Sequence, residues 1–341
     1  MKKSLITLGV LALFVLMAYG QEKKFALYSV AFYNMENLFD TIHDEGKNDY
    51  EYLPNGTNQW NTMKYKAKLK NKSEILSMLS TDKLPMGPAI IGVSEIENYR
   101  VLEDILKQPA LADRGYQYVH YEGADQRGVD CAFFYNPKLF ELTNSKLVPY
   151  VYINDTVHKT RGFLIASGNI AGEKMHFIVN HWPSRAAASP ARERAGEQVR
   201  AIKDSLLRED SAAKIVIMGD MNDDPMDKSM AVALGAKRKP ADVGPTDLYN
   251  PWWDTLKKGY GTLMYKGKWN LFDQIVFTGN LLGTDRSTLK FYKHEIFRRD
   301  FMFQKEGKYK GYPKRTQAGG VWLNGYSDHL PTIIYLIKEV K

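Results

Sequence analysis

Short apolar segments with the character of buried strands recur along nearly the whole chain, and helical patterns separate several of them. Residues 25–33 and 131–135 are rich in aromatic side chains, and residues 89–93 and 214–218 are continuous apolar runs. The other expected strands are residues 175–180, 271–277 and 332–337, and the expected helices are residues 64–80, residues 101–106 and one whose N-cap is Ser189. No repeat, linker or change of composition interrupts this series, so we predict one mature α/β domain over residues 21–341.

The first twenty residues follow a different pattern. Lys2 and Lys3 precede an apolar run over residues 5–17, and small residues at Ala18 and Gly20 offer a cleavage site before Gln21. This is the pattern of a secretory signal peptide. The alternative is an uncleaved membrane anchor, but the run is shorter than the roughly 20 residues that a span needs. We therefore expect residues 1–20 to be a signal peptide and the protein to be exported, to the periplasm or the medium.

Composition narrows the class of protein and the class of partner. With 44% hydrophobic and 25% charged residues, the chain can build a core and is not a disordered protein. Loss of Lys2 and Lys3 with the signal reduces the formal net charge from +8 to +6. This excess favours polyanionic partners such as nucleic acid, anionic lipid or phosphorylated metabolites. The single cysteine, Cys131, lies in an apolar segment and is expected in the core rather than as a nucleophile.

Acidic, amide or histidine side chains stand at the ends of six expected strands. They are Asn34, Glu95, His181, Asp220 with Asn222, Asp273, and Asp328 with His329. A strand end holds a side chain rigidly and still leaves it open to a ligand. Any one of these residues alone would be interpreted as a turn former or a strand cap. Six such ends in one chain indicate a functional site.

The residue types at these ends predict a metal site. Glu95, Asp328 and Asn34 offer hard oxygen ligands, which suit Mg²⁺, Mn²⁺ or Ca²⁺. A zinc site would normally draw on more cysteine or histidine.

The remaining residue types predict the chemistry around that metal. Asp220 and Asn222 are two apart, so on an extended segment both point the same way. One can activate a water molecule while the other donates a hydrogen bond to an anionic oxygen. His181 and His329 can titrate near neutral pH or bind a phosphoryl oxygen. Together these groups favour hydrolysis of a phosphate ester by in-line displacement.

The same residues carry a resemblance to a known family. Read in order, the series resembles the endonuclease/exonuclease/phosphatase superfamily, which includes pancreatic deoxyribonuclease, abasic-site exonucleases and neutral sphingomyelinases. The matching positions are Asn34, Glu95, Asn180-His181, Gly219-Asp220-Met221-Asn222, Asp273 and Ser327-Asp328-His329. The resemblance implies a four-layer α/β/β/α sandwich of two mostly antiparallel sheets flanked by helices. It also implies Mg²⁺, or Mn²⁺ or Ca²⁺ in its place.

The resemblance also implies the role of each metal and water-activating residue. Glu95 resembles the principal metal carboxylate, and Asn34 and Asp328 resemble its supporting partners. Asp220 resembles the residue that orients or deprotonates the attacking water, and Asn222 resembles the phosphate-binding amide.

Two histidines receive roles in the same way. His329 resembles the histidine that contacts the scissile phosphate, paired with Asp273. His181 resembles a second histidine found in the deoxyribonuclease and sphingomyelinase branches, where it protonates the leaving oxygen. Asp130 stands where pancreatic deoxyribonuclease has the acid that partners this histidine; the alternative is a turn residue at a strand entry.

Three further residues are weaker candidates. Arg161 resembles the arginine on the phosphate side of the family's site, and the alternative is a surface charge. Ser184 and Arg185 follow His181 closely and are candidates for substrate contact.

The sequence leaves the substrate open. A nuclease acting on DNA or RNA fits the basic charge, the two histidines and the export signal, and it is the function we expect. Basic residues cluster at 64–72 and at 298–314, the second with interleaved aromatic residues that suit a single strand, although a solvated basic surface is the commoner arrangement. A sphingomyelinase-like phospholipid phosphodiesterase, with Trp252-Trp253 as either membrane contact or core, is the alternative, followed by a soluble phosphomonoesterase and a catalytically inactive binding module. We expect a monomer without an obligate protein partner.

Overall fold

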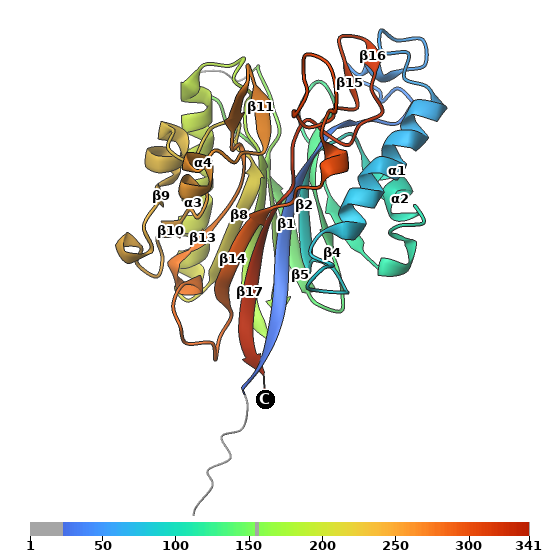
Figure 1. Ribbon diagram of the computed structural model, residues 1–341. Helices are drawn as coiled ribbons and strands as arrows, with labels where there is room; N and C mark the ends of the chain where they lie inside the picture. Colours follow the sequence, from blue (N-terminus) through green and yellow to red (C-terminus); the bar gives the residue numbers. More distant parts are fainter. Residues whose placement is uncertain (1–22, 154–156, 341) are drawn as a thin grey trace, which may run out of the picture.

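A computed structural model describes residues 23–153 and 157–340. The expected signal peptide lies outside these residues. Two β-sheets pack face to face in the middle of the molecule and helices cover the outer face of each sheet, so the chain forms four layers (Figure 1). This is the α/β/β/α sandwich that the resemblance implied.

The first sheet has six strands, of which β1 and β2 are parallel and the other neighbours antiparallel. In spatial order the strands are β14 (Lys290–Ile296), β17 (Thr332–Val340), β1 (Lys24–Leu38), β2 (Ile90–Ile96), β4 (Asp130–Tyr135) and β3 (Gln117–His120). The strands expected at residues 25–33, 89–93, 131–135 and 332–337 all lie in this sheet.

The second sheet has seven strands and is also mixed, with β7 parallel to β8 and β10 parallel to β9. In spatial order the strands are β5 (Glu141–Val148), β6 (Phe163–Ile170), β7 (Glu173–His181), β8 (Lys214–Asp220), β13 (Asp273–Thr278), β10 (Leu248–Tyr249) and β9 (Ala236–Lys237). Two small hairpins stand apart from both sheets: β11 (Leu263–Tyr265) with β12 (Lys268–Asn270), and β15 (Gln317–Ala318) with β16 (Val321–Trp322).

Three apolar clusters hold the four layers together. Alternate residues of β1 point to opposite faces, as a strand requires. Val30 and Phe32 join the cluster between the two sheets, whereas Ala31 and Tyr33 join the cluster beneath the helices. A third cluster lies between the second sheet and its helix. The period-two pattern of the strand therefore supplies two hydrophobic layers at once.

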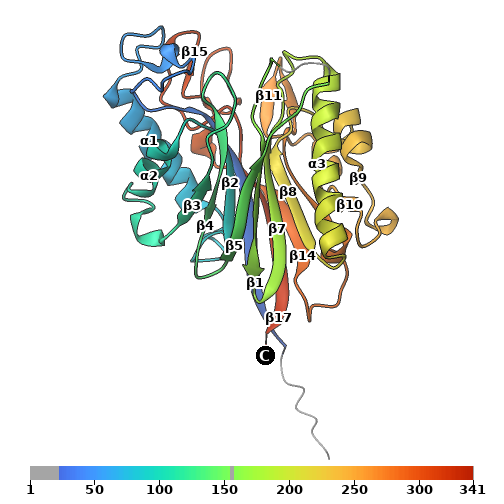
Figure 2. The ribbon, with the colours of Figure 1, turned by 180° about the vertical axis from the view of Figure 1, so that it is seen from behind.

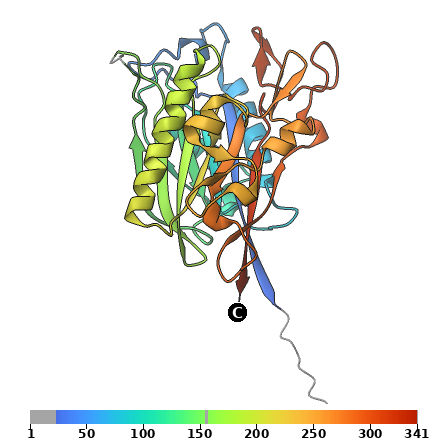
Figure 3. The ribbon, with the colours of Figure 1, turned by 90° about the vertical axis from the view of Figure 1, so that its left-hand side faces the viewer.

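The helices lie on the outer faces of the two sheets. α1 (Thr62–Met78) and α2 (Tyr99–Leu106) cover the six-stranded sheet, and the long α3 (Ser189–Glu209) crosses the seven-stranded sheet (Figures 2 and 3). The short α4 (Trp253–Lys257) follows β10. Asn61 and Asn98 cap α1 and α2 by accepting backbone N–H groups. The expected cap of α3 was wrong by one residue: Ala188 is the N-cap, and the Ser189 hydroxyl contacts Glu193 instead.

The sequence patterns missed several edge strands. β5 and β14 were not expected, because their half-exposed sequences lack the continuous apolar runs of the central strands. β6, a mostly buried inner strand beside β5, was missed as well. Trp252, one of the two candidates for membrane contact, is fully buried, and its indole donates to the Ile275 carbonyl. Within residues 23–153 and 157–340, none of the helices is long and apolar enough to span a membrane.

Candidate active site

Three of the expected site residues lie side by side at one end of the seven-stranded sheet. In the strand register His181 is opposite Asp220, and Asp220 is opposite Asp273. The three residues close β7, close β8 and open β13. Because β8 lies between the other two strands, Asp220 is the central residue of this row.

The six-stranded sheet contributes from an irregular stretch of backbone. β1 and β2 run in parallel with Asn34 opposite Ser94, and their register then shifts. Glu36, Asn37 and Glu95 here, and Asn222 across the site, have positive φ angles of 46°, 51°, 60° and 52°. This left-handed conformation is costly for residues other than glycine and tends to persist where function requires it. The strain turns the Glu95 side chain toward the other sheet.

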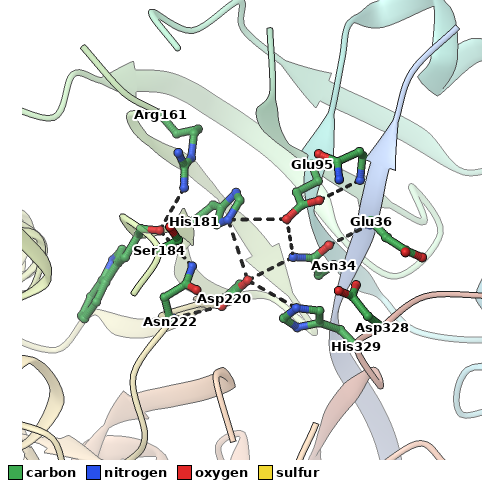
Figure 4. A network of polar contacts seen from close by, with 12 residues as sticks. Asn34, Glu36, Glu95, Arg161, His181, Ser184, Asp220, Asn222, Asp328 and His329 are labelled. Carbon is green, nitrogen blue, oxygen red and sulfur yellow. Dashed lines mark hydrogen bonds and ion pairs between the residues drawn. The ribbon is translucent and has the colours of Figure 1, made fainter. Parts of the chain in front are cut away.

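Asn34 joins the two sheets at the site. Its amide nitrogen donates to Glu95 Oε1 and to Asp220 Oδ2, both at 3.0 Å (Figure 4). Its amide oxygen accepts the Glu36 backbone N–H at 2.7 Å. The oxygen that would bind a metal is therefore engaged by the backbone. Asn34 therefore orients the two carboxylates, and its expected part in metal binding stays a prediction.

His181 lies between the same two carboxylates. Its Nε2 atom is 3.7 Å from Glu95 Oε1 and 3.7 Å from Asp220 Oδ2 (Figure 4). Its Nδ1 atom is buried and has no hydrogen-bond partner among the described residues. Burial, reinforced by the positive charge of Arg161, holds the pKa of His181 well below its usual value. His181 is therefore a neutral imidazole.

His329 has the opposite electrostatic environment. Its Nδ1 atom is 2.7 Å from Asp273 Oδ2, and its Nε2 atom is 3.8 Å from Asp220 Oδ2. Burial opposes protonation, but the Asp273 and Asp220 carboxylates outweigh it and hold the pKa of His329 well above its usual value. Burial, with the nearby Asp273 charge, raises the pKa of Asp220 to about 7. The site therefore contains an imidazolium beside a carboxyl group that titrates near neutral pH.

We call these six residues the catalytic floor: Asn34, Glu95, His181, Asp220, Asp273 and His329. One ligand atom each from Glu95, His181 and Asp220 lies within 4.8 Å of the others. Two carboxylates and a neutral imidazole at this spacing fit a divalent cation. Asp328, which was also expected as a metal ligand, pairs with Arg315 at 2.7 Å and is in none of these groups among the described residues, so its role as a ligand stays a prediction.

The expected partnership between Asp130 and His181 is wrong. Asp130 Oδ2 is 3.2 Å from Nε2 of His120, a residue of the neighbouring strand β3. Asp130 opens β4, and the antiparallel pairing of β3 with β4 brings the two side chains together. His181 is consequently left without a carboxylate on Nδ1.

Arg161 and Asn222 both donate to the Trp182 carbonyl. Arg161 is buried, donates to Trp182 O at 2.9 Å and pairs with Asp125 at 3.0 Å, so it is not a surface charge. Asn222 donates to the same carbonyl at 3.0 Å. Arg185 stacks on Phe272, with its guanidinium carbon 4.4 Å from the ring centroid.

Arg185 also pairs with Asp224 and Asp227, at 3.3 and 2.9 Å. Its charge is therefore matched by local acids. Ser184, drawn in Figure 4, offers its carbonyl to Arg192 at 3.0 Å.

Two buried lysines beneath the floor were missed. The cluster at 64–72 was expected as a basic surface, but Lys68 and Lys72 are 1% and 0% exposed. The Lys68 ammonium donates to the carbonyls of Glu36 and Asn37. Lys72 lies over the ring of Tyr33, 4.8 Å from its centroid. The available signal was their spacing of four, which puts both on one helical face.

An open groove adjoins the catalytic floor, and we call it the tyrosine groove. Its volume is about 680 Å³, and Tyr265, Tyr309 and Tyr312 contribute to its lining with Lys266 and Lys308. Asp328 and Arg315 line it where it reaches the floor.

Backbone contacts attach this groove to the floor. Leu263 of β11 bridges to His329, and the Leu330 N–H donates to the Thr262 carbonyl at 2.9 Å. The Tyr312 hydroxyl accepts the Gly267 N–H at 2.6 Å, which joins the two sides of the groove.

Comparison with known proteins identifies the family. A sequence model of the Endonuclease/Exonuclease/phosphatase family matches residues 29–338. A search of curated protein sequences gave no match.

Several solved structures share the fold at low sequence identity. A Bacteroides thetaiotaomicron protein of the endonuclease/exonuclease/phosphatase family is 15% identical, with a TM-score of 0.57 over 93% of this chain and 97% of that one. A mannosyl-6-phosphatase from the same organism is 14% identical, with a TM-score of 0.56 over 91% and 99%. D. rerio TDP2 complexed with a single-strand DNA product is 16% identical, with a TM-score of 0.54 over 91% and 99%.

The family match spans nearly all of the described residues, and the fold and the donor set of the catalytic floor agree with it. The chain therefore belongs to the Endonuclease/Exonuclease/phosphatase family and is a metal-dependent phosphoester hydrolase.

Proposed function

We propose that this protein is an exported nuclease that hydrolyses phosphodiester bonds of single-stranded nucleic acid. The observation that carries this proposal is the tyrosine groove. Tyr265 and Tyr309 are 62% and 53% exposed beside Lys266 and Lys308, and the groove leads to Asp328, next to His329. Tyrosine faces can stack on unpaired bases while lysines accompany the phosphates.

The floor supplies the hydrolytic chemistry in this proposal. A divalent cation held by Glu95, Asp220 and His181 would neutralise charge on the phosphoryl group and favour its attack by water. The Asp220 carboxylate, placed between both histidines, would accept a proton from the attacking water. The His329 imidazolium donates from Nε2 to a non-bridging phosphate oxygen, and Asp273 holds its ring. Asn34 keeps the two carboxylates in position.

The fold alone does not choose the substrate. Similar solved structures include both a protein complexed with single-strand DNA and a mannosyl-6-phosphatase. The groove supports the first class, because its exposed tyrosines stand beside lysines, which suits several bases and phosphates of one strand. The lipid alternative lost one of its two candidate membrane contacts when Trp252 proved to be core. The proposal that the protein is exported depends on the signal-peptide pattern of residues 1–20. That the protein acts as a monomer is also part of the proposal.

A substrate panel tests the proposal. The full chain is incubated with Mg²⁺ or Mn²⁺ and single-stranded oligonucleotide, plasmid, sphingomyelin, a sugar phosphate and bis(p-nitrophenyl) phosphate, with EDTA and His329→Ala as blanks. We expect metal-dependent cleavage of the oligonucleotide and of the small diester. Turnover of the lipid or the sugar phosphate without the oligonucleotide would overturn the nuclease proposal.

A groove variant then tests the structural argument. Tyr265→Ala/Tyr309→Ala should lower kcat/KM for the oligonucleotide by at least about tenfold, because each stacked base contributes about 1–3 kcal/mol. Hydrolysis of bis(p-nitrophenyl) phosphate should not change. Tyr292→Ala, an exposed tyrosine on β14, is the matched control. An equal loss on both substrates would show that the groove supports the floor and does not bind nucleic acid.

A further inference from the structure

The β3–β4 hairpin gathers a second group of metal-ligand side chains. One ligand atom each from His120, Glu122 and Asp130 lies within 4.8 Å of the others. The group shares no residue with the catalytic floor. The side chains of His120 and Asp130 are only 5% and 4% exposed. β3 is the edge strand of the six-stranded sheet, with β4 beside it (Figure 2).

Among the described residues, no lysine or arginine forms an ion pair with the carboxylates of this group, although Lys47 is near enough to lower the pKa of Glu122 in part. Among the described residues, the Glu122 carboxylate makes no hydrogen bond and no ion pair. The nearby Lys47 donates to the carbonyls of Gly123 and Asp125, and Arg127 pairs with Asp125. Burial and the charge of Asp130 raise the pKa of Glu122. Two adjacent carboxylates with this geometry would be stabilised by a bound cation.

The loop backbone is shaped to bring the carboxylates together. A Cβ atom at Gly123 would lie 2.2 Å from Asp130 Oδ1, so only glycine lets the loop close over this carboxylate. The neighbouring Glu122 is thereby held next to Asp130 and His120.

A second histidine–aspartate pair in the molecule, His43 with Asp49, shows how the His120–Asp130 pair differs from an ordinary pair. His43 Nδ1 lies 2.5 Å from Asp49 Oδ1, so the pairing itself is similar. In the described chain no third ligand atom completes a group around that pair. The hairpin pair differs because Glu122 adds a third ligand.

We propose that His120, Glu122 and Asp130 form a second divalent-cation site of the Zn²⁺ or Mn²⁺ class, separate from the catalytic floor. An imidazole nitrogen with two carboxylate oxygens suits these cations better than Mg²⁺ or Ca²⁺, which prefer oxygen ligands alone. Water would complete the coordination.

Such a cation would clip the hairpin loop to the edge of the sheet. The same loop carries Asp125, which pairs with Arg161 at 3.0 Å, and Arg161 donates to the carbonyl of Trp182 beside His181. Occupation of the site therefore fixes the loop that holds Arg161 in place. Its role is structural support of the catalytic floor from outside it.

Zn²⁺ binding by calorimetry tests the site. The Asp220→Ala variant of the full chain, stripped with EDTA, removes the residue shared by both possible metal groups of the catalytic floor and isolates the hairpin site. We expect this variant to bind one equivalent of Zn²⁺. Adding His120→Ala should weaken that binding at least a hundredfold, and anomalous scattering should place the ion beside His120. Adding His43→Ala instead, the matched control, should leave the affinity unchanged.

A conservative variant distinguishes the loss of a metal ligand from misfolding of the protein. Glu122→Gln keeps the His120–Asp130 pair and removes only the third charged ligand, so the Zn²⁺ affinity should fall at least tenfold with no change in the metal-free circular dichroism spectrum. If Zn²⁺ binding is absent in the Asp220→Ala variant, or is unchanged by both His120→Ala and Glu122→Gln, the proposed site is wrong.

Discussion

The catalytic floor and the tyrosine groove meet at Asp328 and Arg315, but the protein builds them in different ways. The floor consists of mostly buried side chains at strand ends, tied together across two sheets by Asn34. The groove consists of exposed tyrosines and lysines on a small hairpin and on the irregular chain before β17. Groups that perform chemistry need fixed positions, whereas groups that select a substrate can vary on loops. The comparison predicts that substitutions in the floor abolish every activity and substitutions in the groove change only the substrate.

The largest effect should come from Asp220, because it belongs to both histidine–carboxylate groups of the floor. Asp220→Asn removes a metal ligand and the proton acceptor while keeping the size of the side chain. We expect kcat/KM to fall by at least about 10³-fold on oligonucleotide and on bis(p-nitrophenyl) phosphate alike. Asp113→Asn, an exposed carboxylate, is the control. A loss on one substrate only would contradict the division between floor and groove.

Asp273→Asn should have the next largest effect. The variant removes the carboxylate that raises the pKa of His329 and holds its ring through Nδ1. We expect a loss of about 10²- to 10³-fold in kcat on both substrates, by analogy with other histidine–aspartate pairs. The pKa of His329, followed by NMR, should fall in the variant. An unchanged pKa would show that Asp273 positions the ring without affecting its charge.

His294, on the edge strand β14 of the six-stranded sheet, provides a stability test in the apolar layer between the two sheets. His294 packs against Trp252, bonds to Thr255 at 2.9 Å, and burial lowers its pKa to about 4. The unfolded chain binds the proton near pH 6.5 and the folded chain only near pH 4. The free energy of unfolding should therefore fall as pH drops from 6.5 to 4, by at most about 3 kcal/mol, and level off below.

Urea unfolding of the wild type and of His294→Gln at a series of pH values measures this effect. Glutamine can keep the hydrogen bond to Thr255 and does not titrate, so the difference between the two proteins should change over this interval only. A pH-independent difference would mean that His294 does not titrate in the folded core.

The sequence predicted the floor far better than the groove. Residues such as Asp220 and His329 flank strands that are continuous apolar runs, so the sequence identifies both the strand and the polar residue at its end. Tyr265 and Tyr309 lie on chain with no periodicity, and only their long-range contacts bring them together. The basic and aromatic composition of residues 298–314 was visible, but the groove's other side, residues 263–266, was not.

Burial of charge was the other property that the sequence did not reveal. The sequence indicated that Lys68 and Lys72 are solvated charges, but both lie buried under the floor. The lysines on a helical face do not reveal whether that face is exposed or packed against other residues. Asp130 was assigned to His181 by resemblance, and the choice between His181 and His120 depended on the pairing of β3 with β4. Such pairing is a tertiary property, so local patterns could not decide it.

The smallest effect should come from the two lysines of the groove. If Lys266 and Lys308 accompany phosphates, Lys266→Ala/Lys308→Ala should reduce the slope of log affinity against log salt by about 0.7 for each lost contact with a single strand. Fluorescence anisotropy with a labelled oligonucleotide in EDTA measures binding without cleavage. Lys24→Ala/Lys174→Ala, two exposed lysines near the starts of β1 and β7, should leave the slope unchanged. An equal change of the slope in both double variants would mean that the net charge of the protein attracts the strand. In that case the groove would not select the substrate.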